Sequence, residues 1–291
     1  MSGPDGWRIV EDGPERLRLI ERAVERAVSR QAAAEGRRLE IPELDRGEIR
    51  VHEEPAASLW LFRDGPRTVL GDAEAPDGGW LWQELSALAR EEGWSGELMF
   101  GQHPGDDLMA ALAAASHPQR VATKMQISVA SVTEPVGVRL EPMNDEEYAA
   151  YRAASDLGYA QERFASGAAA SLDEAISQAE EEMAQLLPDG PATAGHRLMI
   201  VHDEDGLRLG LLWVHLGDQR GFIYDIEMDE GARGRGAGTQ SLRAAAEMVR
   251  EERLPVLALN VFGHNDGARR LYAREGYRET EVHWSASFPQ A

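Results

Sequence analysis

The chain has 291 residues, of which 43% are hydrophobic and 28% charged, and it contains no cysteine. Its formal net charge of −21 disfavours a nucleic-acid partner, and the lack of cysteine excludes disulfides, thiolate metal sites and a cysteine nucleophile. The length predicts two domains, and the absence of a long apolar run and of a secretory leader pattern predicts a cytoplasmic protein without a membrane partner.

The first part of the sequence predicts a compact set of strands and helices that ends near Pro135. Residues 14–35 form a long helical pattern, in which apolar side chains recur every three or four positions. A proline interrupts the pattern at 131–135, so we expect a first domain at 1–133 and a second at 134–291. The other predicted elements are strands at 7–12, 48–53, 58–62, 67–71, 97–100 and 120–131, and helices at 78–93 and 106–117.

The second part repeats nearly the same order of elements. Three strands joined by short polar turns predict an antiparallel meander before a glycine-rich stretch. The order alone suggests a degenerate tandem repeat, although no clear similarity appears residue by residue. The predicted elements are strands at 137–143, 196–203, 207–216, 221–228, 256–262 and 277–287, and helices at 144–164, 171–187, 238–253 and 265–275.

The glycine-rich stretch allows two interpretations. Between Gly231 and Gly238, eight residues include four glycines and two arginines, which suits either a linker or a backbone cradle for a phosphate. A helix that begins here would present unpaired N–H groups to an anion, and glycine lets a diphosphate approach the backbone. The spacing excludes the dinucleotide fingerprint and the P-loop, since no third glycine follows as required and no Gly-Lys-Ser/Thr occurs.

Two motifs together resemble those of the GNAT superfamily of N-acetyltransferases. Residues 233–238 have the pattern R-x-x-G-x-G, and about 25 residues downstream the chain follows N-x-x-A-x-x-L-Y-x-x-x-G-[FY], at Asn265, Ala268, Leu271, Tyr272, Gly276 and Tyr277. The resemblance covers about 136–287. It implies an α/β fold of two GNAT-like domains, each a mixed, mostly antiparallel sheet flanked by helices, with a splayed parallel strand pair in the second.

The resemblance also implies where acetyl-CoA binds as acyl donor. Pantetheine would enter between the strands at 222–228 and 256–262, and the diphosphate would lie on the amides of 233–238. The same residues also allow roles without a cofactor. Asn260 could be a strand-end residue, Asn265 could be a helix N-cap, and the two arginines could simply flank the turn. The candidate binding residues are Glu227, Met228, Arg233, Gly234, Arg235, Gly236, Ala237, Gly238, Asn260, Asn265 and Tyr272.

Three side chains are candidates for the chemistry. Asp225 and Glu227 alternate along one strand and share a face, so either could take a proton from an amine, directly or through a water, or both could belong to a solvated strand face. Mutual repulsion would raise one of the two pKa values. By the resemblance, the Met228 N–H would stabilise the oxyanion and Tyr272 would be the general acid that protonates the leaving thiolate, although a core tyrosine fits the same helical position.

The predicted function is therefore an acetyl-CoA-dependent N-acetyltransferase that acts on a primary amine by direct transfer in a ternary complex. The acceptor is a small molecule or a protein amino group, and the acidic helices of the second half favour a cationic one or are merely solvated. The alternatives are a non-catalytic acyl-CoA-binding regulator and a mycothiol synthase-like acyltransferase. The histidine spacing predicts no metal site, the first half is expected to bind no CoA, and the chain would be a monomer or a homodimer.

Overall fold

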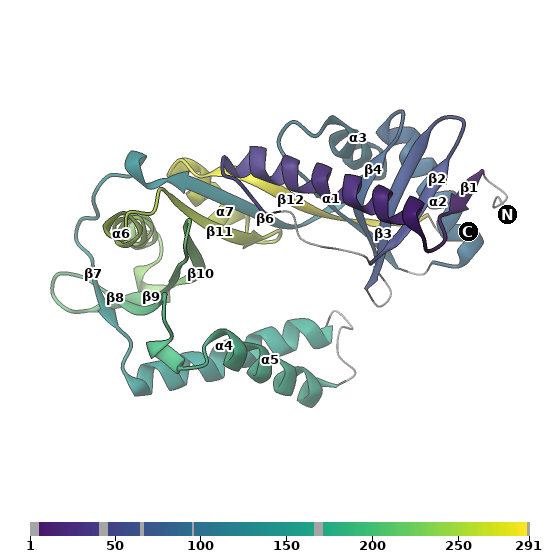
Figure 1. Cartoon of the computed structure of the whole chain (residues 1–291). Helices are drawn as coiled ribbons and strands as arrows, with labels where there is room; N and C mark the ends of the chain where they lie inside the picture. The colour runs from purple at the N-terminus through teal and green to yellow at the C-terminus, as the bar shows by residue number, and fades with distance from the viewer. Residues whose placement is uncertain (1–5, 41–45, 65–66, 95, 166–170, 290–291) are drawn as a thin grey trace. The chain divides into compact units, whose positions relative to one another are not determined.

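A computed structural model describes residues 6–40, 46–64, 67–94, 96–165 and 171–289 (Figure 1). The chain forms two compact units, each treated by itself: unit 1 comprises residues 1–125, 261–270 and 278–291, and unit 2 comprises 126–260 and 271–277. These units group residues by contact rather than by chain order, so the division into 1–133 and 134–291 stays a prediction. In the described part, no helix combines the length and apolar character needed to cross a membrane.

Unit 1 is a mixed, mostly antiparallel sheet with the strand order β1-β2-β3-β4-β5-β12. Among the described strand pairs of this unit, β4 and β5 alone run parallel. Its elements are β1 (Trp7–Ile9), α1 (Pro14–Glu35), β2 (Glu48–His52), β3 (Ala57–Asp64), β4 (Arg67–Glu74), α2 (Gly78–Glu92), β5 (Glu97–Gln102), α3 (Asp107–Ser116) and β12 (Arg278–Ser287). The strand β6 (Gln119–Ser128) begins in this unit.

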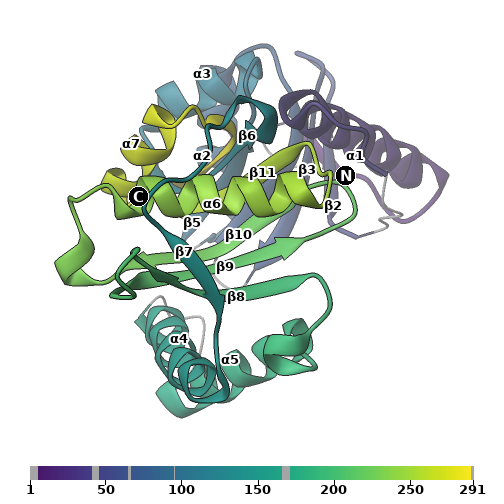
Figure 2. The ribbon, with the colours of Figure 1, turned by 90° about the vertical axis from the view of Figure 1, so that its left-hand side faces the viewer.

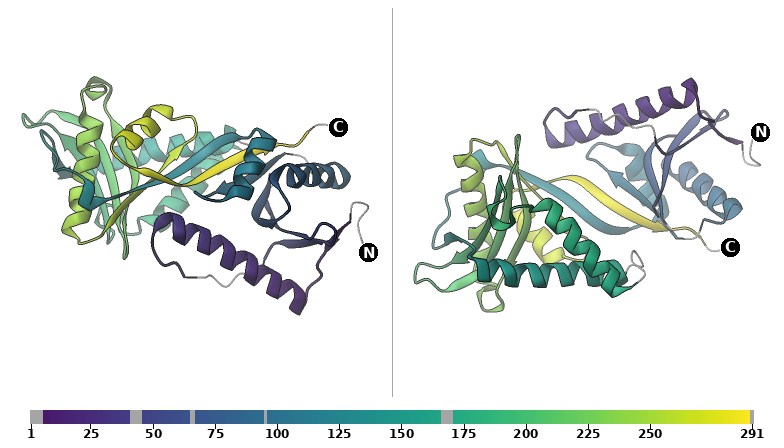
Figure 3. Two further views of the ribbon diagram at one scale, coloured as in Figure 1. Left: turned by 90° about the horizontal axis from the view of Figure 1, so that it is seen from above. Right: turned by 60° about the horizontal axis from the view of Figure 1, so that its bottom comes forward.

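Helices cover both faces of the sheet in unit 1 (Figure 3). On one face, Ile20 and Val24 of α1 pack against Trp60 of β3. On the other face, the neighbouring residues of β3, Leu59 and Leu61, pack with α2 and α3. The alternation of side chains along β3 therefore divides the core into two layers, and the apolar face of the helix at 14–35 packs in one of them.

Unit 2 has the strand order β7-β8-β9-β10-β11; of its pairs in the described part of the chain, β10 and β11 are parallel and the others antiparallel. The antiparallel meander predicted from the turns is confirmed. The elements are β7 (Arg139–Pro142), α4 (Asp145–Ala165), α5 (Leu172–Leu186), β8 (His196–His202), β9 (Arg208–Leu216), β10 (Gly221–Met228), α6 (Ala237–Glu251) and β11 (Val256–Phe262). The helix α7 (Asp266–Arg274) has residues in both units.

In unit 2, α6 covers one face of the sheet and α4 and α5 cover the other (Figure 2). On the α4 face, Tyr151 packs in a cluster with Ile200 of β8 and Trp213 of β9. On the α6 face, Gly221 of β10 lies so close to Val249 that an added Cβ would approach that side chain to 2.2 Å. The helix α6 can therefore lie close to the sheet only because β10 begins with glycine.

A bulge in β10 reverses the direction of its side chains. The parallel pairing with β11 extends over three residue pairs and ends at Ile223, beyond which the strands separate. Ile223 lies opposite Val214 of β9, whereas Asp225 lies opposite Trp213, so that Tyr224 is the bulged residue. Because Val214 and Trp213 are neighbours on a strand, Ile223 and Asp225 face opposite sides of the sheet. The bulge thereby turns Asp225 toward α4.

The strand β4 of unit 1 has the same arrangement. Its parallel pairing with β5 also extends over three pairs and ends at Leu70. Leu70 lies opposite Leu61 of β3, whereas Asp72 lies opposite Trp60, so that Gly71 is bulged. Asp72 is therefore the positional counterpart of the aspartate on β10, and the correspondence between the two units reaches individual residues.

Candidate active site

A cavity of about 470 Å³ lies in unit 2 between α4 and the strands β8, β9 and β10. Its apolar lining includes Met143, Ile200 and Leu211. One basic residue lines it, Arg208, whose Nε lies 3.4 Å from Asp229 Oδ2. The cavity is therefore acidic, because five carboxylates also line it: Glu146, Glu147, Asp225, Glu227 and Asp229.

Asp225 is a half-buried carboxylate of this cavity. The hydroxyl of Tyr151 donates a hydrogen bond to Asp225 Oδ2 at 3.1 Å. Burial raises the pKa of Asp225 above its ordinary value, the hydrogen bond from Tyr151 opposes that rise, and the charge of Glu227 adds to it. A carboxylate with a raised pKa is a better proton acceptor than a solvated one.

Glu227 lies two residues further along β10 in a more open position. Its side chain is 64% exposed, and its Oε1 lies 3.7 Å from Arg233 Nη2. Arg233 Nε also donates to the carbonyl of Met228 at 2.9 Å. The first arginine of the glycine-rich turn thus folds back onto the end of β10, while Arg235 is exposed.

The glycine-rich turn ends in a helix start with no side-chain cap. Gly234 and Gly236 have φ values of 73° and 87°, and nothing lies within 4 Å of a Cβ added to either residue. Gly236 is the N-cap residue of α6, and the first helical bond runs from Gln240 N to its carbonyl. Because no side chain occupies the helix start, the first N–H groups of α6 are available to an anion.

Tyr272 of α7 is 7% exposed. Burial raises the pKa of Tyr272 to about 12, and the charge of Asp225 contributes to the rise. The hydroxyl therefore stays protonated at neutral pH, as a proton donor requires. Its neighbour Tyr277 lies with ring centroids 5.8 Å apart.

The two candidate asparagines lie at element ends. Asn265 Oδ1 accepts a hydrogen bond from the N–H of Ala268 at 3.0 Å and so caps α7, which is one of the two roles its position allows. Asn260 is exposed near the end of β11. Contact with pantetheine stays a prediction for both residues.

Sequence reasoning named two of the five carboxylates that line this cavity and did not name Tyr151. Asp225 and Glu227 line one cavity, as their alternation predicts. The sequence signal for Tyr151 was its spacing from Tyr148 and Ser155, which places the three residues on one helix face. Such spacing does not identify the strand residue that this face contacts. Among the described residues, no cluster of His, Asp and Glu could hold a metal ion.

Comparisons with known proteins identify relatives that are N-acetyltransferases. The model of the Acetyltransferase (GNAT) family matches residues 168–277. The uncharacterized N-acetyltransferase YycN of Bacillus subtilis is 33% identical over 149 residues, which are 50% of this chain and 95% of that protein. A mycothiol acetyltransferase of Beutenbergia cavernae is 35% identical over 94 residues, which are 32% of each chain.

Solved structures also resemble the whole chain. A GCN5-related N-acetyltransferase from Sphaerobacter thermophilus matches 99% of this chain and 98% of its own, with a TM-score of 0.56 and 15% identity, and so supports the fold. The relationship to YycN covers nearly all of that protein. The chain belongs to the GNAT family of acetyltransferases.

Proposed function

We propose that this chain is an acetyl-CoA-dependent N-acetyltransferase that moves the acetyl group to a primary amine by direct transfer in a ternary complex. The observation that carries the proposal is the acidic cavity of about 470 Å³, two of whose carboxylates, Asp225 and Glu227, lie on the strand that leads into the glycine-rich turn. A donor held by the turn and an amine held in the cavity would meet at the end of β10.

The start of α6 supports the donor part of the proposal. The diphosphate of acetyl-CoA would bind the N–H groups at Ala237 and Gly238, where the dipole of the helix favours negative charge. Gly234 and Gly236 leave open space on the side of the missing Cβ, so that the diphosphate can approach the backbone. Pantetheine would then follow the edge of β10 that β11 leaves unpaired beyond Ile223.

The acceptor amine must lose a proton before it attacks, because an alkyl ammonium has a pKa of about 10. Asp225, or Glu227 through a water, takes that proton. The nitrogen then forms a bond to the thioester carbonyl carbon, and the Met228 N–H has the family position for stabilising the oxyanion. When the C–S bond breaks, Tyr272 donates its proton to the leaving thiolate, and the excess proton on nitrogen goes to solvent.

The experiment that tests this function compares Tyr272→Phe with Tyr277→Phe. Tyr277 is buried beside Tyr272, and its hydroxyl has no hydrogen-bond partner among the described residues, so the two variants remove the same atom from neighbouring rings. Thiol release from acetyl-CoA is measured with a panel of primary amines. We expect kcat to fall by about one to three orders of magnitude for Tyr272→Phe and to change little for Tyr277→Phe.

Two results would contradict the proposal. An unchanged kcat in Tyr272→Phe removes the general acid assigned here. Tight binding of acetyl-CoA without thiol release for any amine would instead favour a non-catalytic acyl-CoA-binding regulator. Product analysis by mass spectrometry shows whether the acetyl group resides on nitrogen.

A further inference from the structure

The hydroxyl of Tyr151 is held in one place by the residues around it. Tyr151 is 8% exposed, and its ring lies edge-on to Trp213 with centroids 6.2 Å apart. One turn further along α4, the hydroxyl of Ser155 hydrogen-bonds to that of Tyr151. Packing and hydrogen bonding therefore fix the donor that reaches Asp225.

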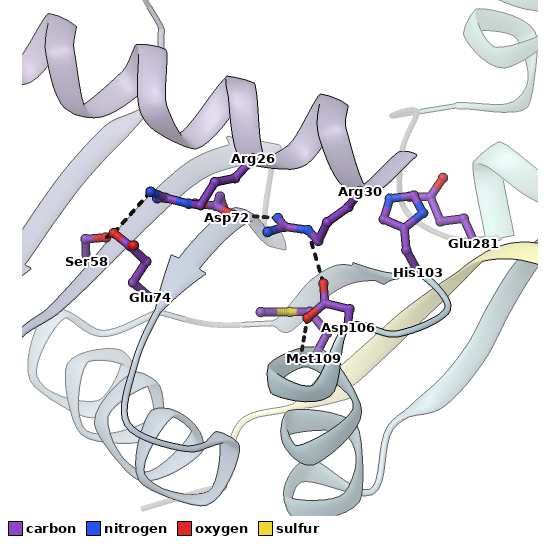
Figure 4. A network of polar contacts seen from close by, with 9 residues as sticks. All are labelled: Arg26, Arg30, Ser58, Asp72, Glu74, His103, Asp106, Met109 and Glu281. Carbon is purple, nitrogen blue, oxygen red and sulfur yellow. Dashed lines mark hydrogen bonds and ion pairs between the residues drawn. The ribbon is translucent and has the colours of Figure 1, made fainter. Parts of the chain in front are cut away.

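The counterpart aspartate in unit 1 has a different kind of partner (Figure 4). Asp72 Oδ2 accepts from Arg26 Nε at 2.9 Å, and Asp72 Oδ1 accepts from Arg30 Nη2 at 2.5 Å. Arg30 Nε also lies 3.2 Å from Asp106 Oδ2. With 1% of its side chain exposed and both oxygens held by guanidinium groups, Asp72 has no oxygen left for a substrate.

We infer that Tyr151 is the positioning residue of Asp225, because it orients the carboxylate through a neutral donor and leaves it able to accept a proton from the amine. This inference rests on the proposed function. In each unit, the partner comes from the helix that follows the first strand: α1 supplies arginines and α4 supplies tyrosine. A guanidinium would hold the carboxylate as an ion-paired anion, whereas a phenol fixes its direction without cancelling its charge.

The charges around Asp225 give the direction of the expected change. Its own strand contributes Glu227 and is followed by Asp229, and β9 contributes Arg208, which is paired with Asp229. The remaining groups that face Asp225 or its tyrosine are Glu146, Glu147 and the Arg152–Asp156 pair of α4 and Tyr272 of α7. Arg233 pairs with Glu227 beyond these groups, yet acids still outnumber cations around Asp225. Because the hydrogen bond from Tyr151 lowers the pKa of Asp225, loss of the Tyr151 hydroxyl raises that pKa further.

The test is the pH profile of kcat/KM for Tyr151→Phe, with Tyr148→Phe as the matched control. Tyr148 lies on the same helix, and its hydroxyl accepts from Arg152 Nη1 at 3.4 Å, outside the cavity lining. The active form has an ionised Asp225, so kcat/KM rises with pH through that pKa. We expect the acidic limb to move up by about one pH unit in Tyr151→Phe and to stay in place in Tyr148→Phe.

A second readout does not depend on acetyl transfer. The carboxyl resonance of Asp225 in protein labelled with ¹³C-aspartate, assigned by its loss in Asp225→Asn, should titrate at higher pH in Tyr151→Phe. If that variant does not fold, Ser155→Ala should move both readouts in the same direction by a smaller amount, because Ser155 polarises the tyrosine hydroxyl.

The outcomes separate the two proposals. An unmoved NMR titration in a folded Tyr151→Phe overturns the role of Tyr151. If the NMR titration moves while the limb of kcat/KM does not, Asp225 is not the proton acceptor of the reaction, and both the positioning role and that step of the proposed function fail. If the wild type transfers no acetyl group but the titration moves, the proposed function fails although the hydrogen bond acts as described.

Discussion

The parallel strand pairs β4–β5 and β10–β11 have the same pattern of pairing. They differ in the helix that follows, because α2 has a side-chain cap at its first turn and α6 has none. After β4, the carboxylate of Asp77 accepts the N–H of Trp80 at 2.8 Å and caps α2. After β10, Gly236 leaves the start of α6 without a side-chain cap. A helix start already occupied by a carboxylate repels a second anion, whereas an open one attracts it. We therefore expect one acetyl-CoA per chain, bound by unit 2.

The cavities beside the two strand pairs also differ in charge. A cavity of about 380 Å³ in unit 1 lies between α1 and the strands β4, β5 and β12. Its lining has one carboxylate, Glu281, whose Oε2 lies 2.7 Å from Lys124 Nζ. Basic residues predominate there: Arg30, Arg67, His103 and His283. The carboxylate of the unit 1 cavity is paired with a cation. In the unit 2 cavity, Glu227 and Asp229 have arginine partners, whereas no ion pair is found for the other three carboxylates among the described residues, which suits proton transfer from a cationic amine.

The largest expected effect comes from substituting the two counterpart aspartates. Asp225→Asn removes the proposed base and should lower kcat/KM by about two to four orders of magnitude with little loss of stability. Asp72→Asn removes the buried anion that Arg26 and Arg30 share, although Glu74 and Asp106 still pair with the two half-exposed guanidinium groups. It should therefore cost roughly 2 kcal/mol of unfolding free energy while kcat/KM stays near that of the wild type. Acetyl transfer and urea denaturation at one temperature measure both quantities.

The opposite results would show that the two aspartates do not have the different roles assigned to them. If Asp72→Asn abolished transfer in a protein that is still folded, unit 1 would hold reacting groups of its own. If Asp225→Asn were as active as the wild type, the Asp225 carboxylate would have a structural role like that of its counterpart.

A smaller effect is expected at the glycine-rich turn. Gly236→Ala places a Cβ on a residue with φ of 87°, which strains the turn by about 1 kcal/mol and shifts the first N–H groups of α6. The Kd for acetyl-CoA should rise about tenfold, since a shift in K of that size corresponds to ~1.4 kcal/mol. Isothermal calorimetry measures the Kd and the stoichiometry together.

Gly93→Ala is the matched control for this prediction. Gly93 caps α2 with φ of 65° and, like Gly236, has nothing within 4 Å of an added Cβ. Both variants should therefore lose similar stability, and only Gly236→Ala should bind acetyl-CoA more weakly. Equal losses of affinity would show that the turn has no special part in donor binding.

The sequence predicts most of this fold because its elements have strong local signals. The helix predicted at 14–35 and the strand predicted at 256–262 have the bounds seen in the structure. The sequence did not predict that the last strand, β12, pairs with β5 of unit 1. A local pattern predicts a strand but does not identify the strand with which it pairs. The parallel pair in unit 1 was missed for the same reason.

The site was predicted in part, since motifs identify residues but not the direction of their side chains. Strict alternation places Ile223 and Asp225 on one face, whereas the bulge at Tyr224 separates them. A bulge depends on the register with a neighbouring strand, so its position has no local signature in this sequence. Tyr151 was not predicted because its hydrogen bond to Asp225 forms only when the bulge directs Asp225 toward α4.

The smallest expected effect concerns the acceptor. Glu146 is an exposed carboxylate on the cavity lining, so Glu146→Gln should lower kcat/KM by about two- to threefold for amines with a second positive charge and less for monoamines. Added salt should reduce the difference, because screening weakens exposed charges. Glu181→Gln, the same substitution on α5 away from the cavity lining, is the control. Equal effects of both variants would mean that the net charge of the protein, and not this cavity, selects the acceptor.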